Sequence, residues 1–138
     1  MRLGVGARVL VPLLLALVAF AASACGPADA STAMTVTIRI HYSKFEPASI
    51  TVPAGVPVTY VIRNDDPIDH EWLAGDAAFH GRHRTGSEAA HADHPDEVSL
   101  PALSTRTTTF ALAAGTYAFI CHFPLHEQYG MIGIVTAK

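Results

Sequence analysis

One stretch near the end of the chain decides most of what the sequence indicates: residues 116–137 read TYAFICHFPLHEQYGMIGIVTA. It places Cys121, His126 and Met131 in the spacing Cys-x4-His-x4-Met, between two runs that are typical of β-strands. A thiolate, an imidazole and a thioether on one short loop form a donor set that suits copper better than other common metals. Taken singly, these residues could be a buried thiol, a loop histidine and a core methionine. Their spacing between two strands favours a metal site.

The chain on the N-terminal side of this stretch also shows short strands separated by Gly and Pro turns. Val36, Ile38, Ile40 and Tyr42 alternate with polar residues, as in a half-buried strand. Further strands are expected at residues 49–52, 57–63, 98–100, 105–112, 116–121 and 132–137. Residues 76–97 are expected to form one long irregular loop, with at most a helical turn near residues 77–83. This pattern predicts an all-β antiparallel sandwich or barrel.

The first 24 residues have the features of an export signal. Arg2 and Arg8 precede an apolar run, and small residues end the segment. Cys25 follows directly, which resembles the lipobox of bacterial lipoproteins, although Ala22 stands where leucine is usual. We therefore expect a signal peptide (1–24), a tether (25–33) and one domain (34–138), anchored outside the cytoplasm by lipidated Cys25. A plain secretory signal with an incidental cysteine is the alternative.

Removal of the signal peptide leaves 114 residues with 7 basic and 12 acidic side chains. This length suffices for one modest domain. The negative charge argues against nucleic acid as a partner, because binding of phosphates needs a basic surface. If Cys25 carries a lipid, Cys121 has no cysteine with which to form an internal disulfide. It is then a buried free thiol, a reactive thiol or a metal ligand, and its neighbours favour the last.

With these residues located, the chain resembles the cupredoxins over nearly all of residues 34–138. The likeness is carried by Phe45-Glu46-Pro47, Ile50, Val52, Gly55, Val58 and Asn64, and by Tyr117 to Cys121, Phe123-Pro124, His126 and Met131-Ile132-Gly133. The resemblance implies a Greek-key β-sandwich that binds one copper ion. It implies His70, Cys121 and His126 as ligands, with Met131 as the distant axial ligand. Glu127 and Gln128 remain alternatives for the axial position.

A cupredoxin of this kind is expected to carry single electrons and to work as a monomer with a redox partner protein. Enzyme activity is not expected, because the chain has no His-x-His pair and no second domain. The alternative is a copper-handling protein that binds, buffers or delivers the ion and exchanges it with a copper donor or acceptor.

Two departures from the usual cupredoxin pattern lie beside the expected ligands. Glu71 follows His70 where a less charged residue is usual. His122 stands where a small or hydroxylated residue is usual, and strand alternation points it away from Cys121. We therefore expect His122 to lie outside the ligand set, near the site or at the surface.

Four histidines in the expected long loop form two i, i+3 pairs, His80/His83 and His91/His94. This spacing would bring both rings of a pair to one ion if the segment were helical. A solvated polar loop is the other interpretation.

Overall fold

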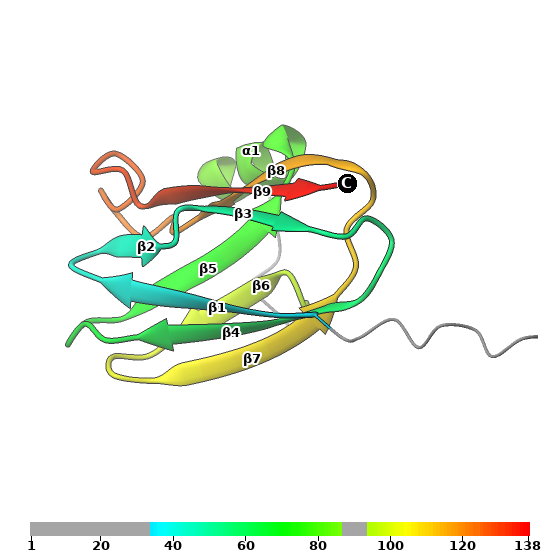
Figure 1. The fold of residues 1–138 in the computed structure, drawn as a ribbon. Helices are drawn as coiled ribbons and strands as arrows, with labels where there is room; N and C mark the ends of the chain where they lie inside the picture. The colour runs from blue at the N-terminus through cyan, green and yellow to red at the C-terminus, as the bar shows by residue number, and fades with distance from the viewer. Residues whose placement is uncertain (1–33, 87–93) are drawn as a thin grey trace, which may run out of the picture. The chain divides into compact units, whose positions relative to one another are not determined.

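The computed structural model describes residues 34–86 and 94–138 (Figure 1). The expected signal peptide (1–24), the lipidation site Cys25, the tether (25–33) and His91 lie outside the described residues. Within the described ranges, no helix has both the length and the apolar character needed to cross a bilayer.

The described residues form two packed sheets, which confirms the expected all-β Greek-key sandwich (Figure 1). One sheet has the strand order β2-β1-β4-β7 and contains β1 (Met34–His41), β2 (Lys44–Glu46), β4 (Val58–Asn64) and β7 (Thr105–Phe110). The other has the order β3-β9-β8-β5-β6 and contains β3 (Ser49–Val52), β9 (Ile132–Ala137), β8 (Gly115–Ile120), β5 (His70–Gly75) and β6 (Glu97–Leu100). The sheets are mixed and not purely antiparallel, because β1 pairs with β4 and β3 pairs with β9 in parallel.

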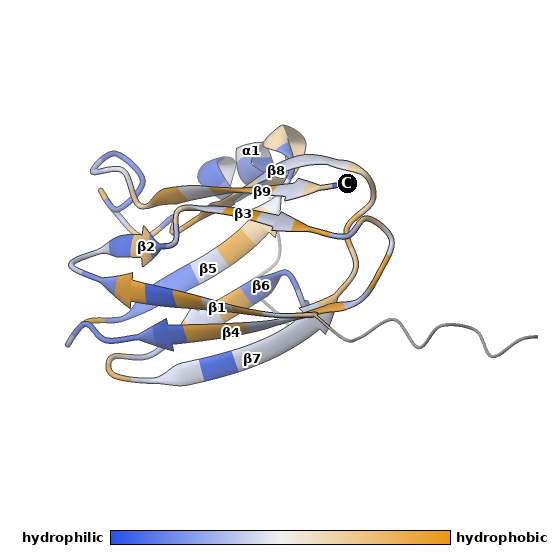
Figure 2. Cartoon of the chain, in the orientation of Figure 1, coloured by the Kyte–Doolittle hydropathy of each residue, from blue (hydrophilic) through white to orange (hydrophobic). Residues whose placement is uncertain are grey.

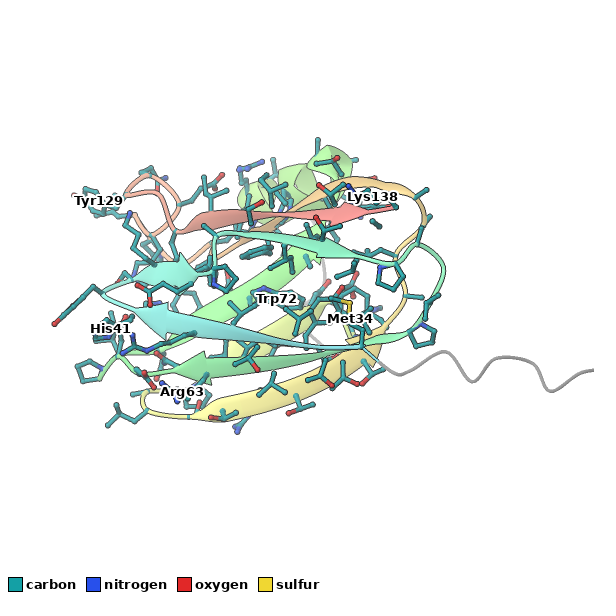
Figure 3. All side chains as sticks on the ribbon, in the orientation of Figure 1. Met34, His41, Arg63, Trp72, Tyr129 and Lys138 are labelled. Atoms are coloured by element: carbon teal, nitrogen blue, oxygen red, sulfur yellow. The ribbon has the colours of Figure 1, made fainter. Side chains whose placement is uncertain are left out.

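The core lies between the two sheets and is rich in aromatic side chains. Trp72 on β5 is fully buried there (Figure 3), with Tyr60 on one side at a ring distance of 5.2 Å and Phe119 at 6.1 Å. Apolar and polar bands alternate along β1 and β4 (Figure 2), as expected for strands with one buried face. The predicted inward set of β1 is correct for Val36, Ile38 and Ile40.

Tyr42 does not continue this inward set. β1 ends at His41, and Tyr42 has a left-handed backbone (φ 50°) and an 81% exposed side chain. The chain turns here because the N–H groups of Tyr42 and Ser43 donate to the buried carboxylate of Asp66, a contact that strand periodicity cannot reveal.

The expected long irregular loop is wrong for its first part, which forms the helix α1 (Ala77–Thr85). Asp76 caps the N-terminus by accepting a hydrogen bond from the N–H of Phe79 at 2.8 Å. Gly86 ends the helix in the left-handed conformation (φ 64°). The helix packs against β5 and β8, the strands that lead to His70 and Cys121.

β5 was not expected as a strand. All six of its residues are buried, so polar and apolar residues do not alternate along it. It lies between β8 and β6 in its sheet, and its first residue, His70, is fully buried.

Candidate metal centre

The loop between β8 and β9, residues 121–131, is closed by its own backbone and is called the ligand loop below. The N–H of Cys121 donates to the carbonyl of Met131 at 3.3 Å, and the N–H of Met131 donates to the carbonyl of His126 at 2.9 Å. The three residues predicted from the Cys-x4-His-x4-Met spacing therefore lie at one end of the sandwich.

His70 enters this end from β5, which pairs with β8. One donor atom each from His70, Cys121 and His126 lie within 4.8 Å of one another. Nδ1 of His126 is 3.2 Å from Nδ1 of His70 and 3.2 Å from Sγ of Cys121. Metal–imidazole bonds of roughly 2 Å place two ligand nitrogens about 3.3–3.5 Å apart, so this spacing suits a shared ion. His70 and Cys121 are fully buried and His126 is half-buried.

The tautomer and orientation of the His70 ring are set by Asp66, a residue that the sequence analysis did not single out. Nε2 of His70 lies 3.0 Å from Oδ2 of Asp66. An ionised carboxylate can only accept, so Nε2 carries the hydrogen and Nδ1 turns its lone pair toward His126. Burial works against ionisation of Asp66, but hydrogen bonds from Ser43, Tyr42 and His70 hold its pKa below the ordinary value. In the sequence, Asp66 is only part of a turn signal.

Burial shifts the pKa values of the other two donor residues, Cys121 and His126. Burial raises the pKa of the Cys121 thiol to about 11, against backbone hydrogen bonds from Glu71 and Phe123 that lower it. The pKa of His126 is lowered, mainly by burial and to a smaller extent by the electrostatic effect of the neighbouring His70. The metal-free centre at neutral pH therefore holds a protonated thiol, and a metal ion must displace that proton.

Three further residues that the sequence singled out lie beside the centre. Met131 is fully buried. The Glu127 carboxylate is bound by Arg84 of α1 and by Nδ1 of His122, while Gln128 is exposed. Because Glu127 is turned toward α1, its carboxylate does not join the group formed by His70, Cys121 and His126.

His122 lies on the α1 side of the ligand loop, outside the group of three donors. Its N–H donates to the buried carboxylate of Glu71 at 2.6 Å, which connects the ligand loop to β5. The His122 side chain is only 9% exposed. The two unusual residues noted in the sequence thus contact each other next to Cys121.

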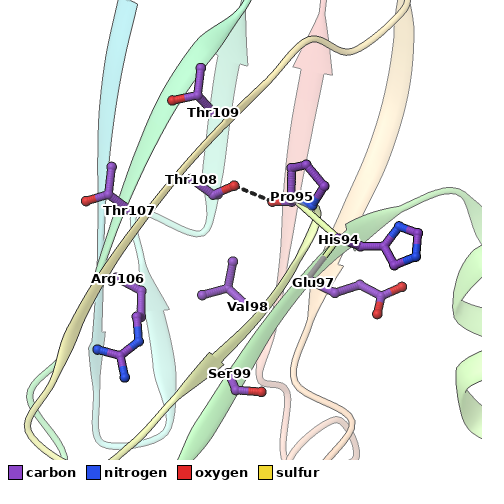
Figure 4. Close-up of a pocket in the computed structure, with 9 residues that line it drawn as sticks. All are labelled: His94, Pro95, Glu97, Val98, Ser99, Arg106, Thr107, Thr108 and Thr109. Carbon is purple, nitrogen blue, oxygen red and sulfur yellow. Dashed lines mark hydrogen bonds between the residues drawn. The ribbon is translucent and has the colours of Figure 1, made fainter. Parts of the chain in front are cut away.

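Of the two i, i+3 histidine pairs noted in the sequence, only His80/His83 lies within the described residues, because His91 does not. His80 and His83 both belong to α1, but Nδ1 of His80 faces His122 across 2.9 Å. His94 is exposed and lines a separate hollow between β6 and β7, where Thr108 donates to the carbonyl of Pro95 (Figure 4).

Comparison with known proteins decides the family of this fold and centre. Residues 13–135 match the family model described as the cupredoxin-like domain. The chain belongs to the cupredoxin-like domain family. It is 33% identical over 120 residues to the copper-resistant cuproprotein CopI of Rubrivivax gelatinosus, covering 81% of this chain and 72% of that protein. It is 29% identical to CopI of Pseudomonas aeruginosa, covering 80% of this chain and 78% of that protein.

Solved structures of auracyanins show the same fold. Auracyanin B superposes with a TM-score of 0.65 and 25% identity, covering 77% of this chain and 89% of the auracyanin. Reduced auracyanin from Roseiflexus castenholzii gives a TM-score of 0.63 at 23% identity, covering 77% of this chain and 98% of that chain. A cupredoxin-like domain whose two imidazoles and one thiol converge supports one copper ion as its cofactor.

Proposed function

We propose that this cupredoxin carries single electrons outside the cytoplasm, with copper held by His70, Cys121, His126 and Met131. The convergence of two imidazole nitrogens and one thiol within 4.8 Å at one end of a rigid sandwich carries this proposal. Such a donor set binds both oxidation states of copper, which supplies the one-electron chemistry when bound. The backbone closure of the ligand loop and the packing of β5 hold the donors in place.

Met131 is proposed as the axial donor for two reasons. It is fully buried, and its carbonyl accepts the N–H of Cys121, so the start of β9 lies beside the thiol. The alternatives are less suited to this position, because Glu127 is engaged by Arg84 and His122, and Gln128 is exposed.

Burial of the donors supports electron transfer rather than catalysis. His70, Cys121 and Met131 are fully buried, and His126 alone of the four is partly exposed. A substrate would need an open coordination position, whereas an electron needs only close approach of a partner to the His126 ring. We therefore propose no enzyme activity.

The surface around His126 suits a protein partner. Large apolar side chains are exposed in the connections β1–β2, β4–β5 and β6–β7 and in the ligand loop: Tyr42, Ile68, Leu103, Leu125 and Tyr129. Hydrogen bonds join these loops, from Tyr42 and Leu103 to Asp66 and from Lys44 to Tyr129. Exposed apolar patches of this kind mark interaction sites. We propose that a redox partner docks here on a monomeric cupredoxin.

The proposed location of the protein, outside the cytoplasm and at a membrane, is inferred from its first 25 residues. The signal-peptide pattern and Cys25 support export and lipid anchoring, which would keep the copper domain close to a membrane. Export into an oxidising compartment also fits the lone thiol of the described domain, which a metal would protect from oxidation.

Copper handling is the second candidate function. It is favoured by the similarity to two proteins named copper-resistant cuproproteins, and by the additional histidines of α1 beside the ligand loop. In this role the protein would bind, buffer or deliver copper and would meet a copper donor or acceptor.

An absorption spectrum of the purified protein with one equivalent of Cu(II) tests the first proposal. A carrier gives an intense visible band and reversible voltammetry, and Cys121→Ala abolishes the band. His94→Ala is the matched control, because this exposed histidine lies apart from the centre. A colourless Cu(I) form that exchanges metal readily would favour handling instead, and a protein that takes up no copper would contradict both functions.

A further inference from the structure

A second pair of histidines faces each other on the opposite side of the ligand loop from His70 and His126. His80 of α1 is 2% exposed, and its Nδ1 lies 2.9 Å from Nε2 of His122. The ring of His83, one helical turn further on, lies nearly parallel to that of His122 at 5.8 Å. None of these three residues belongs to the copper centre described above.

The hydrogen bonds on the far sides of the two rings determine where their hydrogens lie. Nε2 of His80 is 3.1 Å from the carbonyl oxygen of Ala118, which can only accept, so Nε2 carries a hydrogen. Nδ1 of His122 is 3.1 Å from the Glu127 carboxylate, which also accepts a hydrogen bond from Arg84 and can only accept, so Nδ1 carries a hydrogen.

A neutral imidazole has only one N–H group. The two nitrogens that face each other across 2.9 Å therefore both present lone pairs. Two lone pairs at this distance repel, and burial makes the repulsion stronger because the local dielectric is low. The arrangement becomes favourable when a cation lies between the rings.

The same pattern occurs in the copper centre. There, Asp66 holds the hydrogen on Nε2 of His70, and the two Nδ1 atoms of His70 and His126 face each other across 3.2 Å. Hydrogen-bond acceptors on the far nitrogen are the usual means of orienting a metal-binding histidine. In the second pair, the Ala118 carbonyl accepts from the far nitrogen of His80, and the Glu127 carboxylate accepts from the far nitrogen of His122.

We propose that His80 and His122 bind a second transition-metal ion, of the borderline class to which Cu(I), Cu(II) and Zn(II) belong. Imidazole nitrogen is a preferred ligand for these ions. A hollow of about 250 Å³, lined by His83, His122 and Glu127 among others, opens beside the pair. Water or a further side chain can reach the ion from there. The inference goes beyond the proposed function, because it requires none of the ligands of the copper centre.

The two sites are adjacent in the chain, since Cys121 and His122 share a peptide bond. The Cys121 side chain faces the core, whereas the His122 ring faces α1. The ligand loop would then hold one ion on each side.

Metal stoichiometry of the purified full chain tests the proposal. The protein is saturated with Cu(I), or separately with Zn(II), passed through a desalting column and analysed for bound metal. Cys121→Ala disables the copper centre, so we expect it to retain one ion of at least one of the two metals. Adding His80→Gln or His122→Gln to this variant should reduce retention at least tenfold. Adding His94→Gln is the matched control and should change nothing.

The visible band of the otherwise native protein separates this inference from the proposed function. His80→Gln should keep the band with Cu(II) while losing the second ion. A thermal unfolding curve for each variant checks that it folds, and His122→Gln gives a second variant if His80→Gln does not. The proposal is overturned if Cys121→Ala binds neither metal, or if binding persists without both histidines.

Discussion

Replacement of Asp66 by Asn tests how the copper centre is connected to the fold. The change keeps the size of the side chain and removes its charge. Oδ1 of Asp66 accepts the N–H of Tyr42 at 2.8 Å, and Oδ2 accepts the N–H of Ser43 at 2.7 Å and Nε2 of His70 at 3.0 Å. Asn has one accepting oxygen and turns an NH₂ group toward the remaining donors. At least one of these hydrogen bonds is therefore lost whichever way the amide is oriented.

Two effects of Asp66→Asn can be given magnitudes. Hydrogen bonds to charged groups contribute about 1.5–3 kcal/mol each, so the free energy of unfolding should fall by about 2–4 kcal/mol. His70 also loses the partner that orients its ring, and changes of this kind typically weaken metal binding about 10- to 100-fold. The reduction potential should become more positive, because a neutral amide stabilises Cu(II) less than a carboxylate does.

Urea unfolding of the copper-free protein measures the first effect, and competition with a chelator for Cu(II) measures the second. Asp69→Asn is the matched control, because Asp69 is exposed and accepts one hydrogen bond, from the N–H of Ala102. We expect it to leave copper affinity unchanged. If Asp66→Asn lowers stability but not copper affinity, the carboxylate holds the β1–β2 turn without orienting His70. If neither changes, the reasoning about Asp66 is refuted.

Three further predictions concern the ligand loop and β9. Copper binding at pH 7–9 should release one proton, because the pKa of Cys121 is raised to about 11 and the thiol must lose its proton. Chelator competition should then show the copper affinity of the native protein rising about tenfold per pH unit, and an affinity independent of pH would contradict this. Met131→Leu should cost less than about 1.5 kcal/mol of stability yet shift the absorption band and raise the potential, and an unchanged spectrum would exclude Met131 as a ligand. In Gly133→Ala the new Cβ would collide with the buried Phe119 ring, so urea unfolding should show that the free energy of unfolding falls by about 3 kcal/mol. Gly81→Ala, where nothing lies within 4 Å of the added Cβ, should be neutral or stabilising in the same assay.

The fold could be predicted for longer strands with one exposed and one buried face, whereas the three-residue strand β2 was missed because it is too short to show a period. Alternation located β1, β4 and β9 to within a residue or two, because period-2 patterns follow directly from strand geometry. It failed at β5, where both faces are buried, and at Tyr42, where a distant carboxylate turns the chain. It also missed most of α1, a helix whose only buried residue is a histidine, so that no apolar stripe marks it.

The residues of the copper centre also differ in whether the sequence alone reveals them. Cys121, His126 and Met131 lie on one short loop, so their proximity follows from chain connectivity and could be inferred from spacing alone. His70 is distant in the chain, and it was expected from family resemblance and not from any local pattern. The structure brings it to the loop through the pairing of β5 with β8.

The sequence by itself determined the class of fold, the metal preference and three of the proposed ligands, because strand periodicity and short-range spacing are properties of neighbouring residues. Only the tertiary structure decided which ring nitrogen of His70 is available, that Glu127 is turned toward α1, and that His80 faces His122. These features depend on hydrogen bonds between residues far apart in the chain. Such bonds form only when the sheets and α1 have packed, so no local pattern records them.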